Sequence, residues 1–360
     1  MRYDIAVIPG DGIGKEVVPE AQRVLECAGE IWGFVLQWNE FDWGCEYYVR
    51  TGSMMPEEGM EQLRSHDAIF LGAVGYPGVP DHVSLWGLLI PIRREFGQRI
   101  NLRPVRLLDG LESPLRDVSP LDIDITVVRE NNEGEYSEVG GRLYKGQDQE
   151  LAVQESIFTR RGVESVMRYA FDLAGGRHGK LTSATKSNGI IHTMPFWDEI
   201  FREVSADYPE VETEQEHIDA LAARFVLKPQ SLDVIVASNL FGDILSDLGA
   251  AISGSIGIAP SANLDPTGDH PSMFEPVHGS APDIAGQGIA NPIGQIWSGA
   301  MMLDHLGYGE AATGILSAIS RTLSRTNIRT PDLGGASETK EVTDAILQAL
   351  TEHEDSMRIS

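Results

Sequence analysis

Runs of apolar, β-favouring residues recur along this chain, and segments with the apolar spacing of a helix separate them. The strand-like runs span residues 3–8, 68–73, 124–129 and 233–238. The helix-like segments span residues 16–30, 161–175, 193–207 and 336–353. Strands that alternate with helices are typical of α/β proteins, in which helices join neighbouring parallel strands. The pattern therefore predicts an α/β fold built on a large, mostly parallel sheet.

Length and charge limit the classes of partner. The 360 residues, 42% of them apolar, can bury a large core and favour two lobes. The sequence holds 54 acidic residues against 28 basic ones, a formal charge of −26. This excess repels nucleic acids and anionic membrane surfaces, so neither is expected as a partner. An anionic small molecule would have to bind where arginines and lysines gather locally.

Cysteine content and hydropathy set the expected compartment. Only Cys27 and Cys45 are present, too few for a disulfide framework. The N-terminal residues run straight into a strand without the apolar core of a signal peptide, and no apolar run approaches the roughly 18 residues of a membrane span. We therefore expect a cytoplasmic protein.

The turn after the first strand has the sequence Gly10-Asp11-Gly12-Ile13-Gly14. It resembles the dinucleotide-binding fingerprint, but the third glycine comes one position early and Lys15 stands in its place. A tight turn before a helix N-terminus can still approach a nicotinamide nucleotide. The pattern nevertheless does not match that of a conventional Rossmann domain.

Two aspartates, Asp243 and Asp247, stand four residues apart in a segment with the pattern of a helix start. At that spacing both carboxylates project from one helical face, about one turn apart. Ligation by oxygen alone favours a hard cation such as Mg²⁺ or Mn²⁺ over zinc. The alternative is a solvated helix start, because aspartates near a helix N-terminus also complement the helix dipole.

A third acid, Asp219, lies on another helix-like segment and has apolar neighbours in the sequence. Burying a free carboxylate there would be costly, and a bound metal would remove that cost. Asp219 is therefore a further candidate metal ligand.

Three arginines are candidates for binding carboxylates. Arg93 lies in the segment at residues 91–96, Arg103 lies in the segment at residues 101–104, and Arg129 ends an apolar strand. Guanidinium groups bind carboxylates through paired donors, and α/β proteins usually place ligand sites at the carboxyl ends of strands. The alternative for each arginine is a structural ion pair with one of the many acids.

Two further residues are candidate proton-transfer groups. Tyr136 follows Arg129 in a polar loop, where neighbouring positive charge would lower the phenol pKa and make it a general acid. Lys186 follows a strand-like run among small polar residues, and nearby cations would make its amine a base near neutral pH. The alternatives are an ordinary loop tyrosine and a surface lysine.

A glycine-containing loop at residues 275–286, followed by residues 289–292, carries histidine, serine and aspartate side chains. Backbone amides in such a loop can hold phosphate. The carboxylate of Asp283 could accept hydrogen bonds from a ribose 2′-hydroxyl and would repel a 2′-phosphate. The loop therefore predicts a nucleotide site that favours NAD over NADP.

Taken together, these segments resemble the β-decarboxylating dehydrogenase family of isopropylmalate and isocitrate dehydrogenases. The resemblance runs from the turn at residues 8–14 to the final helix. It is carried above all by Asn239-Leu240-Phe241-Gly242-Asp243-Ile244-Leu245-Ser246-Asp247 and by His278-Gly279-Ser280-Ala281-Pro282-Asp283. Residues 74–89 and 271–276 are most similar to the tartrate and decarboxylating D-malate dehydrogenases within the family.

The resemblance implies an isopropylmalate dehydrogenase-like two-lobed α/β fold with a large mixed, mostly parallel sheet that is not a conventional Rossmann domain. Residues 1–100 and 255–360 would form the large lobe, with the cofactor loop. Residues 101–254 would form the small lobe, with the dimerisation surface and the metal and substrate residues.

The resemblance also implies a role for each candidate residue. Arg93, Arg103 and Arg129 would clamp substrate carboxylates. Asp243 and Asp247 would hold Mg²⁺ or Mn²⁺, with Asp219 donated by the second subunit of a homodimer. Lys186 would help to remove the C2 hydroxyl proton as hydride passes to NAD⁺, and Tyr136 would protonate C3 after CO₂ loss. The residues that would cradle the adenosine half of NAD are His278, Gly279, Ser280, Ala281, Asp283 and Asn291.

Other functions stay open at this point. The apolar Leu88, Leu89 and Ile90 would tolerate the branched substituent of 3-isopropylmalate, so that substrate competes with D-malate and tartrate. A Mg²⁺-dependent phosphoryl-transfer enzyme could use the same aspartates, but the chain lacks a Walker-type loop. A non-catalytic subunit would be expected to have lost one of the catalytic side chains, and all are present.

Overall fold

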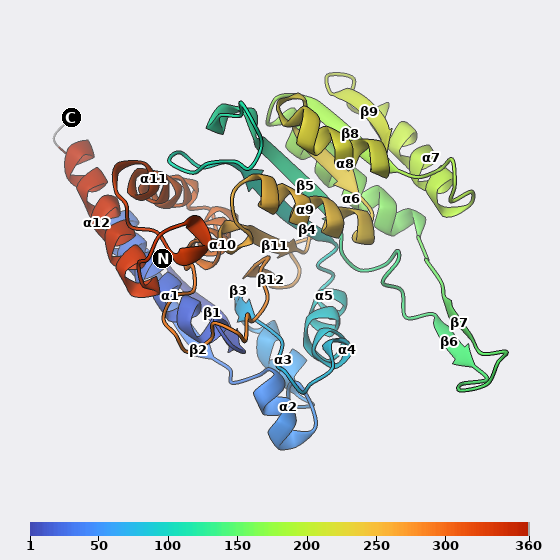
Figure 1. Ribbon diagram of the computed structural model, residues 1–360, viewed down its shortest axis with the longest axis horizontal. Coiled ribbons are helices and arrows are strands. Elements are labelled where there is room, and N and C mark those ends of the chain that lie inside the picture. Colours follow the sequence, from blue (N-terminus) through green and yellow to red (C-terminus); the bar gives the residue numbers. More distant parts are fainter. Residues whose placement is uncertain (359–360) are drawn as a thin grey trace.

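A computed structural model describes residues 1–358, with side chains as far as residue 352. Most strands form a single 10-stranded sheet in the order β2-β1-β3-β12-β11-β4-β5-β10-β8-β9 (Figure 1). Its strands are β1 (Arg2–Gly10), β2 (Val35–Glu40), β3 (Ala68–Ala73), β4 (Ile100–Arg106), β5 (Asp124–Glu130), β8 (Lys180–Thr185), β9 (Glu212–His217), β10 (Val234–Ala237), β11 (Pro260–Leu264) and β12 (Ser272–Pro276).

The sheet is parallel towards both edges and antiparallel in the middle. Strands β2, β1, β3 and β12 pair in parallel, as do β5, β10, β8 and β9. Between these groups, β12, β11, β4 and β5 pair antiparallel. The predicted α/β fold with a mixed, mostly parallel sheet is therefore confirmed, and the order differs from that of a doubly wound dinucleotide domain.

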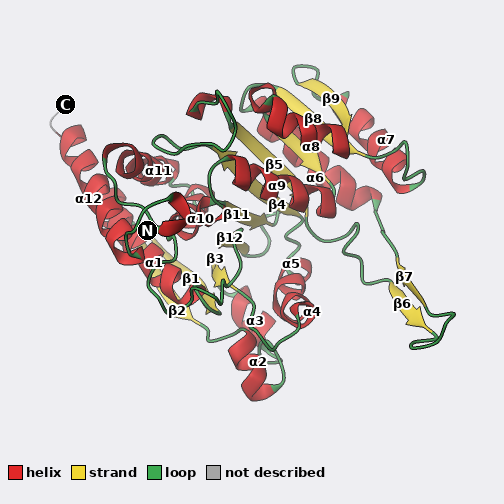
Figure 2. Ribbon diagram, in the orientation of Figure 1, coloured by secondary structure: helices red, strands yellow, loops and turns green. Residues whose placement is uncertain are grey.

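Helices cover both faces of the sheet (Figure 2). The helices are α1 (Gly14–Trp32), α2 (Cys45–Thr51), α3 (Gly59–Arg64), α4 (Asp81–Ser84), α5 (Ile90–Glu95), α6 (Arg160–Gly175), α7 (Thr193–Ser205), α8 (Ile218–Leu227), α9 (Asn239–Ile252), α10 (Ile293–His305), α11 (Gly309–Arg325) and α12 (Thr339–Arg358). A π-helical turn, η1 (Leu85–Leu89), joins α4 to α5. Each of the four predicted helices and four predicted strands coincides with an observed element to within a few residues.

One large hydrophobic core runs beneath most of the sheet and its helices. Helices α1, α10, α11 and α12 pack against one another beside the first strands. In the other half, α6 and α7 pack against β5, β10 and β8, and α8 packs against α9. A second, smaller cluster lies between β1, β3 and α5 and includes the fully buried Leu88. The division into lobes at residues 100/101 and 254/255 stays a prediction, because one continuous sheet crosses both boundaries.

A two-stranded arm extends away from the rest of the structure (Figure 1). It consists of β6 (Gly140–Leu143) and β7 (Leu151–Gln154), which pair antiparallel. Every residue of both strands is exposed, including apolar ones. No helix among residues 1–358 is both long enough and apolar enough to span a membrane.

Candidate active site

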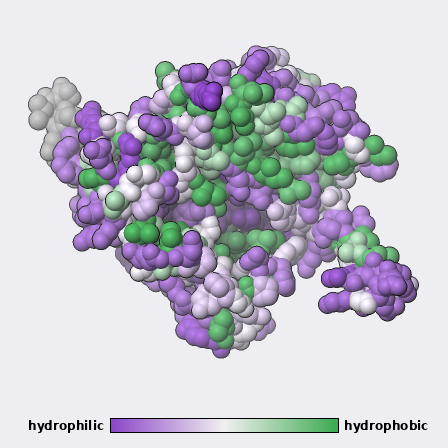
Figure 3. Space-filling model, viewed as in Figure 1, coloured by the Kyte–Doolittle hydropathy of each residue, from purple (hydrophilic) through white to green (hydrophobic). Residues whose placement is uncertain are grey.

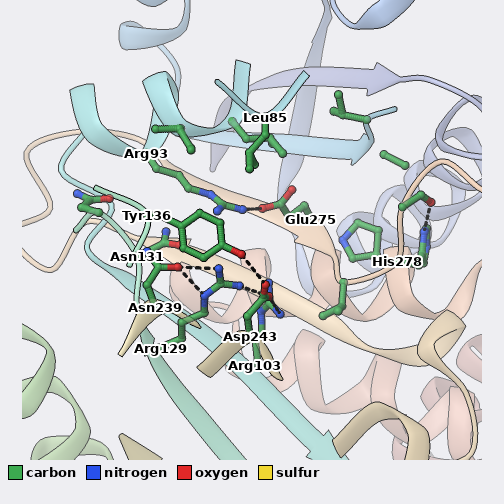
Figure 4. Close-up of a pocket in the computed structure, with 18 of the residues that line it drawn as sticks. Leu85, Arg93, Arg103, Arg129, Asn131, Tyr136, Asn239, Asp243, Glu275 and His278 are labelled. Carbon is green, nitrogen blue, oxygen red and sulfur yellow. Dashed lines mark hydrogen bonds and ion pairs between the residues drawn. The ribbon is translucent and has the colours of Figure 1, made fainter. Parts of the chain in front are cut away.

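A cavity of about 210 Å³ opens where the middle of the sheet meets α5 and α9. Figure 4 shows its lining, which comes from segments far apart in the sequence. The candidate residues that line it are Arg93, Arg103, Arg129, Tyr136, Asp243, His278 and Gly279. The sequence interpretation therefore grouped residues that the fold brings together, although more than 180 positions separate the first from the last.

Strand geometry aims the arginines into the cavity. In the β4–β5 pair, Arg103 lies opposite Val127 and Arg129 lies opposite Asn101. Side chains alternate along a strand, so Arg103 and Arg129 occupy the same face of the antiparallel pair. Helix α9 packs on that face, and a Cβ on its Gly242 would lie 2.6 Å from the Cβ of Arg129. Glycine therefore allows the helix that carries the aspartates to approach Arg129 closely.

Asp243 is the central acceptor of the site. Its Oδ1 accepts hydrogen bonds from the Nη1 of Arg129 and, at 3.0 Å, from the Nη1 of Arg103, while the Tyr136 hydroxyl donates to its Oδ2 at 3.2 Å (Figure 4). Burial raises the pKa of Asp243, but Arg129 and Arg103 outweigh it and hold the pKa below its usual value. Asp243 is therefore a carboxylate at neutral pH.

Asp247 follows one turn later on α9, as predicted. Its Oδ1 lies 4.0 Å from the Nη1 of Arg103, and its side chain is 58% exposed. Burial, with the adjacent charge of Asp243, raises the pKa of Asp247. A hard cation between the two carboxylates would relieve that repulsion, so the donor set fits Mg²⁺ or Mn²⁺.

The guanidinium groups of Arg93, Arg103 and Arg129 are buried. Those of Arg103 and Arg129 lie close to one another, because both donate to the same oxygen of Asp243. Burial and the neighbouring Arg103 lower the pKa of Arg129 to about 9, against the opposing effect of Asp243. Asn239, the first residue of α9, accepts hydrogen bonds from the Nε and Nη2 of Arg129 at 3.1 and 2.7 Å. The cations are held in place while their mutual repulsion favours an anion in the cavity.

Glu275 is a site residue that the sequence analysis missed. Its Oε1 accepts hydrogen bonds from the Nη2 of Arg93 and the Nδ2 of Asn263, both at 2.8 Å, and it lines the cavity. In the sequence Glu275 belongs to the segment similar to tartrate dehydrogenases and begins the cofactor loop, but it carries no predicted role of its own. A glutamate next to the apolar Met273 and Phe274 in a strand-like run was a signal that a buried cation faces it.

Tyr136 is held over the cavity by its own loop. The preceding residue, Glu135, accepts hydrogen bonds from the Ser238 hydroxyl at 2.8 Å and from the Leu240 amide at 3.1 Å, which ties the loop to the start of α9. Burial and Asp243 raise the pKa of Tyr136, although Arg129 and Arg103 oppose them. The expected lowering of this pKa was therefore wrong, and the phenol keeps its proton at neutral pH.

Lys186 and Asp219 lie outside the cavity. The Nζ of Lys186 lies 2.5 Å from the Oδ1 of Asp219, and their side chains are 29% and 69% exposed. The expectation of a buried Asp219 was wrong, because only one side of α8 packs on the protein. Lys186 offsets the slight burial and lowers the pKa of Asp219. Among the residues that the structure describes, no three acids, histidines or cysteines are grouped as metal ligands.

The candidate cofactor loop docks on the first turn of the chain. The amide of Ile13 donates to the carbonyl of Ser280 at 2.9 Å. Gly12 has φ +52°, and a Cβ there would lie 2.1 Å from the same carbonyl oxygen. Glu16 accepts hydrogen bonds from the amides of Gly286 and Gly288 at 2.6 and 2.9 Å. Gly12 therefore allows this loop to pack on the first turn.

Three of the candidate cofactor residues suit a nucleotide, and a fourth is already engaged. The Nε2 of buried His278 has no hydrogen-bond partner, and the space around Gly279 is open. Asp283 is exposed, and its carboxylate makes no hydrogen bond within residues 1–352. In contrast, the side chain of Asn291 is engaged within the protein. Its Nδ2 donates to the Oδ2 of Asp332 at 3.0 Å, and its Oδ1 accepts a hydrogen bond from the backbone amide of Ile293.

The apolar side of the cavity differs from the expected one. Leu85, Leu89 and Ile90 line it, on η1 and the start of α5. Leu88 instead points into the second core, so its expected contact with substrate was wrong. The reason is that successive residues of a helix point about 100° apart, so three consecutive side chains do not share one face.

Comparisons with known proteins agree with this arrangement. The family model described as isocitrate/isopropylmalate dehydrogenase matches residues 4–346. The chain is 57% identical to a probable tartrate dehydrogenase/decarboxylase of Bacillus subtilis over 97% of this chain and 98% of the relative. It is also 57% identical to the decarboxylating D-malate dehydrogenase of Escherichia coli, over 96% of this chain and 98% of the relative.

Solved structures give the same result. An isocitrate dehydrogenase from Methylococcus capsulatus aligns with a TM-score of 0.87 at 33% identity, over 97% of this chain and 99% of that one. A β-decarboxylating dehydrogenase from Thermococcus kodakarensis aligns with a TM-score of 0.80 at 37% identity, over 99% of both chains. The chain therefore belongs to the isocitrate/isopropylmalate dehydrogenase family and is a decarboxylating dehydrogenase.

Proposed function

We propose that the protein oxidises and decarboxylates a small 2-hydroxy diacid of the D-malate or tartrate type, with NAD⁺ as hydride acceptor and Mg²⁺ or Mn²⁺ as its metal. The observation that carries this proposal is the position of Asp243 between Arg103 and Arg129, at the edge of an arginine-lined cavity. The two relatives at 57% identity, a probable tartrate dehydrogenase/decarboxylase and a decarboxylating D-malate dehydrogenase, support the same substrate class.

The arginines would bind the two carboxylates of the substrate. Arg93, Arg103 and Arg129 are buried, and a dianion would balance their charge. The Nε of Arg93, a residue that lines the cavity, is buried without a hydrogen-bond partner, so this donor remains unused within the described residues. Guanidinium donors in fixed positions also orient the substrate, which contributes to rate by proximity.

In the proposed reaction, Lys186 accepts the proton of the C2 hydroxyl as hydride leaves C2 for NAD⁺. The resulting keto diacid loses the carboxylate attached to C3 as CO₂, and the electrons of the broken bond form an enolate. Tyr136 then donates its phenolic proton to C3. A divalent cation held by Asp243 and Asp247 would supply Lewis acidity that favours the keto and enolate forms.

The loop from His278 to Asp283 would bind NAD⁺. His278 offers an unpartnered buried Nε2, and Gly279 leaves room for the cofactor at the cavity rim. The exposed carboxylate of Asp283 would accept a hydrogen bond from the ribose 2′-hydroxyl and repel a 2′-phosphate. A preference for NAD⁺ over NADP⁺ follows from that charge.

A homodimer would complete the site. Figure 3 shows an apolar area over α8 and α9, whose exposed members include Val226, Leu227, Leu240 and Ile244. The same two helices carry Asp219, Asp243 and Asp247. In a symmetric dimer through this surface, α8 of one subunit would approach α9 of the other. The exposed apolar residues of the β6–β7 arm offer a second contact for the partner.

Lys186, like Asp219, would belong to the active site of the other subunit. The 2.5 Å contact between them ties the lysine to α8. If the partner supplies Asp219 to the metal, it also supplies Lys186 to the substrate. Each active site would then combine the arginines, Tyr136, Asp243 and Asp247 of one subunit with Lys186 and Asp219 of the other.

Subunit mixing tests this arrangement. Lys186→Ala and Asp243→Asn homodimers should both be inactive, and mixing them should restore activity, because one site in each heterodimer receives no substitution. A mixture of Lys186→Ala with Asp219→Asn is the matched control and should stay inactive, since every site then carries one defect. Rescue in both mixtures, or in neither, would refute the shared site.

The substrate class is tested by NADH formation with Mn²⁺ on D-malate, tartrate and 3-isopropylmalate side by side. We expect the first two to be turned over fastest. Leu85, Leu89 and Ile90 give the cavity an apolar side, so 3-isopropylmalate is the second candidate. No NADH from any of the three acids would overturn the proposed function, and faster use of NADP⁺ would overturn the role of Asp283.

A further inference from the structure

Arg94 connects the helix of the substrate arginine with the loop of Tyr136. It follows Arg93 on α5, and its Nη2 donates to the backbone carbonyl of Tyr136 at 3.1 Å. Its Nη1 lies 3.2 Å from Glu138, and its guanidinium lies 4.9 Å over the ring of Trp86. No other side chain among residues 1–352 donates a hydrogen bond to the Tyr136 carbonyl.

The guanidinium group of Arg94 is already bonded to other residues of the protein. Both terminal nitrogens have protein acceptors, and one face of the guanidinium covers Trp86. The neighbouring Arg93 differs, because its Nε is unpartnered at the cavity. Arg94 also lines the cavity, but its paired donors suit it to hold the loop and not to bind a substrate carboxylate.

The loop that Arg94 holds is also tied to α9, to β7 and within itself, and the Nε2 of Gln154 on β7 donates to the Ser137 carbonyl at 2.5 Å. Glu135 fastens one side to α9, and the hydroxyl of Ser137 donates to the Gly134 carbonyl at 2.7 Å. Only Arg94 links this loop to α5 through hydrogen bonds of the described side chains. The position of the phenol relative to a substrate held by Arg93 therefore depends on this contact as well as on the hydrogen bond from the Tyr136 hydroxyl to Asp243.

We propose that Arg94 is a positioning residue for the proposed proton donor, fixing the Tyr136 phenol relative to the substrate held by α5. This inference rests on the proposed function, in which Tyr136 protonates C3. Without Arg94 the substrate still binds to Arg93, Arg103 and Arg129. Protonation of C3 slows, because the Tyr136 phenol is no longer held within reach of that carbon. A shift of about 1 Å in a reacting group can cost on the order of a hundredfold in rate.

A double-mutant cycle with Tyr136→Phe tests the inference. Arg94→Ala should lower kcat about tenfold or more, with KM for the diacid changed less than about threefold. In the Tyr136→Phe background the same substitution should change kcat less than about twofold, because no phenolic proton is left to position. Equal losses in both backgrounds would refute the inference, and so would a rise in KM with kcat unchanged.

Arg64 provides the matched control. It also pairs with a glutamate, Glu95, at 2.8 Å and lies 5.4 Å over an aromatic ring, Phe96, but it does not contact the Tyr136 loop. Arg64→Ala should leave kcat within about twofold in both backgrounds. A tenfold loss in Arg64→Ala would assign the effect of Arg94 to general packing and overturn the inference.

The outcome separates this inference from the proposed function. If Tyr136→Phe alone turns over at the rate of the unsubstituted protein, the role of Tyr136 fails before Arg94 is considered. If Tyr136→Phe is slow and the cycle shows no coupling, only the role of Arg94 fails. Arg94→Lys should recover part of the loss, since an ammonium can still donate to the Tyr136 carbonyl.

Discussion

Glu130 is a buried acid whose charge the fold disfavours, and Glu130→Gln should stabilise the protein at alkaline pH. The residue ends β5, next to Arg129 in sequence, and its side chain is buried. Its Oε1 accepts hydrogen bonds from the amides of Asn132 and Glu133 at 2.8 and 3.1 Å. Glutamine keeps that oxygen, so the substitution removes the charge while preserving the turn that leads to Tyr136.

The magnitude follows from the change in pKa. Burial, only partly offset by the two amides, raises the pKa of Glu130 from 4.5 to about 7. Because the folded protein holds this proton more tightly than the unfolded chain, the carboxyl contributes stability at low pH that is lost as the pH rises through 7. Between pH 5 and pH 8 the loss amounts to about 2–3 kcal/mol.

Urea unfolding at fixed protein concentration measures this effect. The free energy of unfolding of Glu130→Gln minus that of the unsubstituted protein should increase by about 2–3 kcal/mol from pH 5 to pH 8. Comparing two pH values cancels any constant cost of the new amide. Glu57→Gln, which removes an exposed carboxylate, is the control and should show no such change with pH. A difference that stays constant within about 0.5 kcal/mol for Glu130→Gln would refute the reasoning.

Three further outcomes are expected. Asp243→Asn should lower turnover about a hundredfold or more in a steady-state assay, because it removes the charge between Arg103 and Arg129 and a proposed metal ligand; a loss below tenfold would contradict that role. Gly12→Ala should raise KM for NAD⁺ more than KM for the diacid, since its Cβ would meet the Ser280 carbonyl at 2.1 Å; equal changes in the two KM values would contradict the link to the cofactor loop. Raising the salt concentration should lower KM for the diacid, because salt screens the repulsion from the exposed acids more than the attraction to the buried arginines; a KM that rises with salt would contradict it.

Local patterns in the sequence predicted the local parts of this structure. The helical spacing of residues 16–30 and the four-residue spacing of Asp243 and Asp247 both correspond to helices, α1 and α9. Both features depend on neighbours within one turn, and a sequence displays such neighbours directly. The resemblance to a family then brought distant segments together in a way that no periodicity could have done.

The parts that the sequence did not predict depend on contacts between distant segments. The antiparallel middle of the sheet joins β11 to β4 through pairings across about 160 residues, as between Leu102 and Ala262. Glu275 became a site residue only because β12 carries it to Arg93. The raised pKa of Tyr136 reflects burial beside Asp243, which the charges near it in sequence did not reveal.

The charge of the cavity resolves the conflict between an acidic protein and an anionic substrate. Across the whole chain, acids outnumber basic residues by 54 to 28, yet the cavity lining contains Arg93, Arg94, Arg103 and Arg129 with only Asp243 and Glu275 as acids. Partly buried charges are screened less than exposed ones, so this local excess of positive charge determines what binds in the cavity. The exposed acids act at longer range, and salt screens them. A few arginines therefore suffice to bind a diacid, because Arg93, Arg103 and Arg129 are buried and each is fixed by a protein acceptor. The composition of the surface carries little information about the substrate.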